Sequence, residues 1–463
     1  MAKTLEDAHR DLIGPDYTPV GHDFASITQQ ISSLVLRRHT HPGWLALFSL
    51  GNGLILMFGC VVIYLLVRGV GIWGINIPVG WCFTITDFVW WIGIGHAGTL
   101  ISAFLLLMHQ KWRTSINRIA EAMTIFAVMC AGMFPLIHLG RPWYFYWLLP
   151  YPNTMRLWPQ FRSALVWDVF AVSTYFTVSL LFWYMGMVPD LATLRDRATS
   201  KLGRVVYGML ALGWRNSARH WHRYEMAYLL LGGLATPLVV SVHSVVSSDF
   251  AISVMPGWHE TVFPPYFVAG AIFSGFAMVI ALCIPIRHFY KVKDLITIDH
   301  LDVMAKILLA TCFLTSYGYL SEQTMSWFGG ENVEGFLYFN RLIGVAQYAP
   351  VTWAIVFCNV LAPQVLWFRR VRRSEVMLLI VSVIVLAGMW MERYMIIASS
   401  LSRDYLPSSW GIFRPTIWDI LTYIGSLGVF IAAFLLFCRF LPIISMSELR
   451  AMLPGAHGRE EGT

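Results

Sequence analysis

Residues 88–109 have the sequence FVWWIGIGHAGTLISAFLLLMH, which contains no Asp, Glu, Lys or Arg. An α-helix of about 20 apolar residues is long enough to cross the hydrocarbon core of a bilayer, so this stretch predicts a membrane-spanning helix. Similar stretches recur along the chain. They predict ten spanning helices in all, at residues 44–67, 88–109, 119–138, 163–188, 225–246, 264–288, 300–327, 345–368, 375–398 and 417–440. The sequence therefore predicts an all-α integral membrane protein.

The composition and the placement of charge agree with this fold class. Hydrophobic residues make up 57% of the chain and charged residues only 13%, about half the charged fraction of an ordinary soluble domain. With ten spans, most Lys and Arg fall on the side that holds both termini, including the loops 195–223 and 369–373. The positive-inside rule then places both termini in the cytoplasm. Since topology explains the net charge of +7, we expect no nucleic-acid partner.

The chain divides into one membrane domain and two extramembrane ends. Residues 1–43 are polar and lack the short apolar run and cleavage site of a signal peptide, so we expect a cytoplasmic N-terminal arm. Residues 44–441 form the ten-helix transmembrane domain, and residues 442–463 form a cytoplasmic tail. The first spanning helix is then its own insertion signal.

The cysteines predict no metal centre in this chain. There are seven, and they are scattered, without a C-x-x-C pair, a C-x-x-C-H haem-attachment motif or a ferredoxin-like run. We therefore expect neither an iron–sulfur cluster nor a haem of its own, and no bound metal.

Several ionisable residues lie near predicted helix ends on the non-cytoplasmic side. His138 ends the third span, Asp168 lies just inside the fourth, Asp249 follows the fifth, and Arg393 lies near the outer end of the ninth. Inserting a charged side chain into the membrane costs on the order of 3 kcal/mol of free energy. Such side chains therefore usually pair with another group or take part in function. Simpler interpretations stay open, because His138 is also typical of an interfacial residue and Asp249 of a loop acid. Arg393 is either the structural partner of Asp168 or a side chain that reaches to the interface.

A second set of ionisable residues suggests a proton path across the membrane. His96 lies near the middle of its span, His243 toward the outer end of the fifth, and Glu121 at a cytoplasmic helix start. Asp302 and Lys306 are four residues apart, so a local ion pair explains them as well as a proton path does. A packed core histidine is the alternative for His96, beside its neighbouring glycines.

A histidine, carboxylates and an arginine lie near one membrane surface among aromatic residues, and this combination is typical of a site that oxidises a quinol. A quinol is a lipid-soluble ring that loses two electrons and two protons on oxidation, and it needs an apolar slot with a few polar groups. Histidine and carboxylate side chains can accept the protons. The electrons have to leave through another subunit.

Long motifs in this chain resemble a known family, the polysulfide-reductase membrane subunits (NrfD/PsrC-like). The motifs are WWIGIGHAGTLISA (90–103), FPLIHLGRPW (134–143), WDVFAVSTY (167–175), DFAISVMPGWHETVFPPYFVAGAIFSGFAM (249–278) and RDYLPSSW (403–410). Within the family they look most similar to the quinol-oxidising (ActC-type) membrane subunit of bacterial alternative complex III, a respiratory or photosynthetic complex. The paralogous ActF-type subunit, a structural or proton-conducting scaffold without quinol, is the alternative.

The resemblance implies an architecture, a substrate and partners. Eight helices would form two four-helix bundles, spans two to five and six to nine, with two peripheral helices. Menaquinol or ubiquinol would bind in the first bundle near the periplasmic surface of a bacterial inner membrane. His138, Asp168, Asp249 and Arg393 match the polar pocket positions: His138 and Asp168 would accept protons, Asp249 would release them, and Arg393 would keep the acid ionised.

The partners that the resemblance implies are an iron–sulfur subunit on the periplasmic side, a paralogous ten-helix subunit, a multihaem cytochrome c and lipids. A haem-bearing quinone anchor and an ion-coupled transporter are less consistent with the sequence. Only His96 is deep enough to suggest an axial ligand, and the polar residues gather toward one surface rather than at the midplane.

Overall fold

The structure is a computed structural model that describes residues 17–149, 161–344 and 348–453. The described residues form helices, turns and loops without any β-strand. Ten helical segments are long and apolar enough to cross a membrane. The predicted all-α class and the ten predicted spans are thereby confirmed.

The spanning helices keep close to their predicted limits. They are α3 (Pro42–Arg68), α4 (Phe83–Thr99), α6 (Asn117–His138), α7 (Ala164–Arg197), α9 (Ala218–Ala251), α10 (Phe263–Phe289), α11 (Ile298–Gly329), α13 (Ala349–Ile355), α15 (Glu375–Leu401) and α16 (Ile417–Phe440). The second span continues from α4 through a π-helical turn, Leu100–Phe104, into α5 (Leu105–Leu107). The eighth continues from α13 through a π-helical and a 3-10 segment that end at Trp367.

The largest boundary differences are at α7 and α9. The prediction ended α7 at residue 188 and began α9 at residue 225, whereas the helices run on to Arg197 and begin at Ala218. These extensions are polar. Because the prediction was based on apolar runs, it marked the limits of the membrane-embedded part, whereas the helices continue beyond the membrane.

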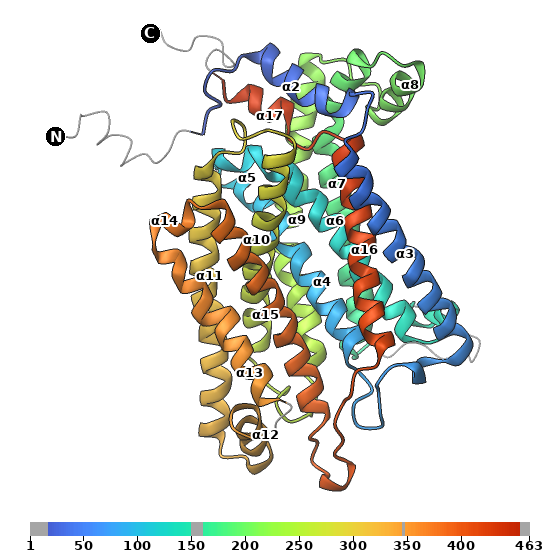
Figure 1. Ribbon diagram of the computed structural model, residues 1–463, viewed down its shortest axis with the longest axis vertical. Helices are drawn as coiled ribbons and strands as arrows, with labels where there is room; N and C mark the ends of the chain where they lie inside the picture. The colour runs from blue at the N-terminus through green and yellow to red at the C-terminus, as the bar shows by residue number, and fades with distance from the viewer. Residues whose placement is uncertain (1–16, 150–160, 345–347, 454–463) are drawn as a thin grey trace, which may run out of the picture.

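Shorter helices complete the chain. They are α2 (Phe24–Leu36), α8 (Lys201–Leu210), α12 (Asn332–Leu342), α14 (Arg369–Arg372), α17 (Met446–Ala451) and the 3-10 turns Val70–Ile72, Lys111–Ser115, Pro142–Leu148 and Pro407–Ser409. Figure 1 shows α2, α8 and α17 at one end of the helices and α12 at the other. We term these ends the terminal side and the distal side.

Two bundles meet along α4 and α10. Helices α4, α6, α7 and α9 pack as the first bundle, and α10, α11, α13 and α15 pack as the second, as the resemblance implied. A Cβ added to Gly275 of α10 would collide with Ala97 of α4, so glycine permits this close contact. The apolar window of α4 is 78% buried, whereas that of α3, which pairs with α16 at the periphery, is only 22% buried. The centre of the protein is therefore α4.

Candidate functional site

His138 lies at the distal end of α6 within an aromatic wall. Its Nδ1 is 3.1 Å from the Thr84 hydroxyl of α4, and its ring lies 6.4 Å from the rings of Trp73 and Trp81. Its Nε2 forms no hydrogen bond with the residues that the structure describes. The Thr84 contact fixes the ring, so Nε2 is left for a ligand.

Asp168 and Asp249 come together at the distal ends of α7 and α9. Their carboxyl groups are close enough to interact, and two neighbouring buried carboxyls favour holding one proton between them over carrying two like charges. Oδ1 of each is buried and has no hydrogen-bond partner within the described part of the chain. Buried polar atoms are nearly always paired, so two unpaired oxygens on one carboxyl pair indicate a place for a polar ligand or water.

A chain of aromatic rings runs from the histidine to α9, the helix that carries Asp249. Trp81 packs on Trp258 at 6.3 Å between rings, and Trp258 packs edge-on against Phe250 at 4.9 Å, next to Asp249 in the sequence. No hydrogen bond links His138 directly to either aspartate among residues 17–149, 161–344 and 348–453. The three predicted residues thus all lie at the distal side, and the aromatic rings beside His138 continue to Phe250 on the helix that carries Asp249.

The expected pairing of Arg393 with Asp168 is wrong. Arg393 of α15 pairs with its neighbour Glu392 at 3.1 Å, and its guanidinium lies 3.9 Å from the ring centre of Phe267. Glu392 also accepts a hydrogen bond from the Tyr266 hydroxyl. Arg393 therefore faces α10 in the second bundle, and its charge is balanced there. The prediction failed because it matched charges by membrane depth, without knowing which helix face each one occupies.

His96 and His243 form a buried pair between α4 and α9. Their ring centres are 4.4 Å apart, and His96 also stacks on Tyr175 at 5.2 Å. Nδ1 of His96 is 2.6 Å from the Ile92 carbonyl oxygen. His96 Nε2 and both nitrogens of His243 are buried without a partner in the described residues. Such atoms in a polar interior are typical sites of ordered water.

Glu121 belongs to a charged cluster inside the terminal end of the first bundle. It lies 3.2 Å from Arg118, whose guanidinium is also 3.9 Å from Asp190 of α7. All three are buried, and Tyr228 of α9 donates to Glu121 at 3.3 Å. Arg118 was not predicted as part of the site, although its spacing of three residues from Glu121 is a signal for an ion pair on a helix.

Asp302 and Lys306 form the local ion pair that was one of the two interpretations. Their charged groups are 2.7 Å apart, and Arg372 adds a second cation to Asp302 at 2.8 Å. The Lys306 side chain is 56% exposed. These residues lie at the terminal end of α11 in the second bundle, away from the histidine pair.

The distal side of the second bundle holds a polar cluster that was not predicted from the sequence. The Tyr338 hydroxyl lies 2.8 Å from Glu260 and 2.7 Å from Glu322, and Arg341 donates to Glu322 at 2.9 Å. One phenolic hydrogen serves only one carboxylate, so a proton on Glu260 completes the network by donating to Tyr338. Burial, together with the nearby charge of Glu322, raises the pKa of Glu260 to about 8.

A pH dependence of stability follows from Glu260. Its pKa in the folded protein, about 8, exceeds the ordinary value of 4.5, so the folded state binds more protons between these values. Stability from this group is therefore present at low pH, falls as pH rises and is lost above about pH 8. Thermal unfolding midpoints over this range should show a smaller slope in Glu260→Gln, whose amide can still donate to Tyr338. The exposed Glu225→Gln is the control, and an equal slope in Glu260→Gln would contradict the assignment.

The described residues hold no group of three or more His, Cys, Asp or Glu side chains arranged for a metal ion.

Comparison with known proteins identifies a family and relatives. The family model "Polysulphide reductase, NrfD" matches residues 73–403. The chain is 26% identical over 241 residues to a putative dimethyl sulfoxide reductase membrane subunit of Halobacterium salinarum, covering 50% of this chain and 51% of that one. It is 26% identical over 211 residues to a selenate reductase subunit of Mesobacillus selenatarsenatis, covering 44% and 47%. The chain thus spans about half the length of these curated relatives.

Proposed function

The chain belongs to the polysulphide reductase NrfD family, and from this premise we propose that it is the quinol-oxidising membrane subunit of a multi-subunit oxidoreductase. The observation that carries the proposal is the Asp168–Asp249 carboxyl pair with its two unpaired oxygens, at the same distal side as His138 and its aromatic neighbours. An apolar wall with a few polar groups is the environment that a quinol ring needs. This chain alone is not expected to be active.

These residues can accept both protons of the reaction, and the electrons leave through a partner subunit. Oxidation of one quinol to quinone releases two electrons and two protons. Neutral His138 takes one proton at Nε2, and the Asp168–Asp249 pair, which already holds one proton, takes the other. Asp249, partly exposed near the distal end of α9, passes protons to water. The two electrons would leave to an iron–sulfur cluster held by a partner subunit on the distal side.

The two relatives support the direction of electron flow. Both are named as subunits of reductases, and a reductase needs a membrane donor of electrons, which a quinol supplies. We propose alternative complex III as the assembly, on the motif resemblance, with a paralogous ten-helix subunit and a multihaem cytochrome c as further partners. Menaquinol or ubiquinol is the substrate class.

The basic loops support an orientation in the membrane. Helix α14, which contains Arg369 and Arg370, follows the terminal-side end of the eighth span, and the loop that carries α8 lies on the terminal side. By the positive-inside rule this side is cytoplasmic, so the distal site faces the periplasm of a bacterial inner membrane. Residues 17–43, with α2, belong to the cytoplasmic arm, and α17 belongs to the tail.

A second candidate function has its own observations. The paralogous subunit of the same complex would conduct protons without binding quinol, and the His96–His243 pair and the Arg118 cluster lie in the first bundle as such a path requires. Solvent extraction of quinone from the purified assembly, combined with a density map, separates the two functions. A ring-shaped ligand beside His138 supports the first, and an empty, quinone-free site overturns it.

His138→Leu is expected to weaken quinol binding by roughly 10-fold, because one hydrogen bond to a buried acceptor is lost while the apolar volume stays. The measurement is the KM for a short-chain quinol with the purified assembly. His288→Leu, which removes an exposed histidine from the terminal end of α10, is the control. An unchanged KM in His138→Leu would exclude a direct bond between this imidazole and the quinol.

A further inference from the structure

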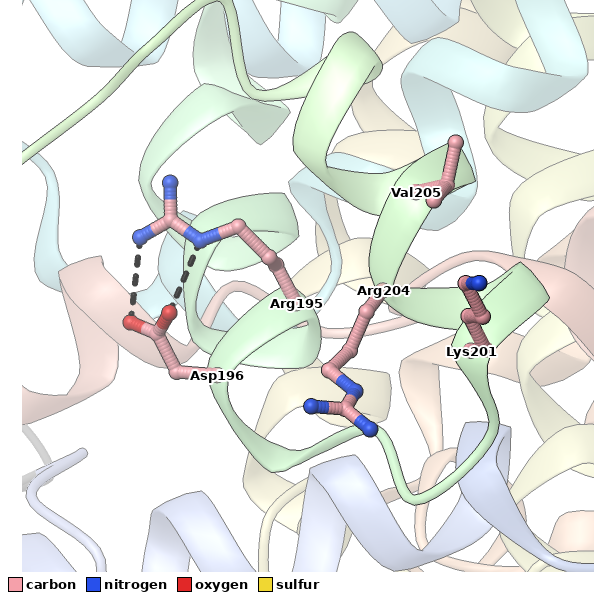
Figure 2. A pocket seen from close by; sticks show the side chains of 5 residues that line it. All are labelled: Arg195, Asp196, Lys201, Arg204 and Val205. Atoms are coloured by element: carbon pink, nitrogen blue, oxygen red, sulfur yellow. Dashed lines mark hydrogen bonds and ion pairs between the residues drawn. The ribbon is translucent and has the colours of Figure 1, made fainter.

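A cationic hollow lies on the terminal side between the end of α7 and helix α8. It has a volume of about 670 Å³ and is lined by Arg195, Asp196, Lys201, Arg204 and Val205 (Figure 2). Arg195 is paired with Asp196 at 2.8 Å, so these two charges cancel. The side chains of Lys201 and Arg204 form no hydrogen bond or ion pair with the described residues, and Figure 2 draws none from them. The hollow therefore has two uncompensated positive charges.

Helix α8 is amphipathic and has no buried residue. At about 100° per residue, Leu202, Val205, Val206 and Met209 fall within one arc of the helix. Leu202 is 75% exposed and Met209 66% exposed. An amphipathic helix with basic residues, next to spanning helices, is typical of a segment that lies in the membrane interface.

The apolar and cationic faces meet at Val205. Lys201 and Arg204 lie on the adjacent arc of α8, and Val205 both lines the hollow and belongs to the apolar face. The helix is held in this position by the Tyr207 hydroxyl, which donates to the Phe440 carbonyl of α16 at 3.0 Å. A ligand that fits both faces has an anionic head and an apolar body.

We propose that this hollow binds the phosphate of an anionic phospholipid from the leaflet on the terminal side. Lys201 and Arg204 bind the phosphate oxygens, and the acyl chains lie along Leu202, Val205 and Met209. The anionic headgroups of a cytoplasmic leaflet attract such basic segments. The site is separate from the distal candidate site, so it does not depend on quinol binding; it rests only on the proposed cytoplasmic orientation of the terminal side.

The test compares spin-labelled phosphatidylglycerol with spin-labelled phosphatidylcholine bound to the purified assembly in phosphatidylcholine nanodiscs. In the Lys201→Ala/Arg204→Ala variant, the ratio of the affinity for phosphatidylglycerol to that for phosphatidylcholine at this site is expected to fall about 10- to 30-fold. Each cation near the membrane surface raises the affinity for an anionic lipid by about a factor of five. Arg369→Ala/Arg370→Ala removes the same charge from the same side, outside the hollow, and should keep the preference. Equal loss in both variants would overturn the proposal, because the effect would then be general surface charge.

Two further arms separate the lipid from other occupants. Leu202→Gln/Val205→Gln should weaken phosphatidylglycerol binding although both cations remain, and excess inorganic phosphate should not displace the lipid beyond a chloride control of equal ionic strength. If inorganic phosphate displaces phosphatidylglycerol completely and Leu202→Gln/Val205→Gln has no effect, the hollow is a site for free phosphate. That result would overturn the proposal of a lipid site. Loss of the preference in the intact assembly, but not in the isolated chain, identifies a protein partner on α8 and overturns it as well.

Discussion

Asp168→Asn is expected to lower quinol oxidation by the purified assembly at least about 100-fold, the usual contribution of a positioned proton acceptor. Asparagine keeps the shape of the side chain and still bonds to Asp249, but it cannot take up a proton. The unpaired Oδ1 of Asp168 is the proposed proton acceptor. In asparagine this position holds either an amide oxygen, which does not take up a proton, or an amide NH2 group, which only donates. Steady-state reduction of the electron acceptor by quinol measures the effect, and kcat should fall more than KM changes.

The control for this variant is Asp299→Asn. Asp299 is a partly exposed aspartate on the terminal side, paired with Arg373 at 2.7 Å, and its loss should leave turnover within about two-fold because a surface ion pair contributes little. Size-exclusion chromatography of both variants shows whether all subunits remain assembled. Full turnover in an assembled Asp168→Asn protein would remove Asp168 from the mechanism and favour the proton-conducting alternative.

The sequence was enough to predict the fold because each spanning helix is specified locally. A run such as 88–109 is apolar over the full thickness of a bilayer, and no tertiary contact is needed to recognise it. The depth of each ionisable residue follows from the same count. Asp168 and Asp249 could therefore be placed near one surface before it was known that α7 and α9 bring their carboxyl groups into contact.

The partners of these residues could not be predicted in the same way, because they depend on helix rotation. Arg393 has the right depth to reach Asp168, yet its face of α15 is turned toward Phe267 and Glu392. His243 and His96 lie on different helices, and only the packing of α4 against α9 makes them a pair. Tyr338 of α12 sits outside every spanning helix, so a search for charges within spans passes over it.

Arg118→Met is expected to destabilise the protein by about 3–5 kcal/mol, because it leaves two buried acids without their cation. The Arg118 side chain is fully buried, and it pairs with Glu121 and Asp190, both also buried. Methionine fills a similar volume, so the lost charge dominates over the change in packing. The midpoint of thermal unfolding in detergent, measured by tryptophan fluorescence, reports the loss.

Burial rather than the number of ion pairs decides this effect, and a matched variant tests that. Arg373 is 2.7 Å from Asp299, closer than Arg118 is to Glu121, but both partners are more than one-third exposed. Arg373→Met should therefore change stability by less than about 1 kcal/mol. The double variant Arg118→Met/Glu121→Gln should be more stable than Arg118→Met alone, because one unpaired buried acid is gone. Equal stability of the single and double variants would mean that Arg118 acts through its hydrogen bonds to the Trp183 and Gly186 carbonyls instead.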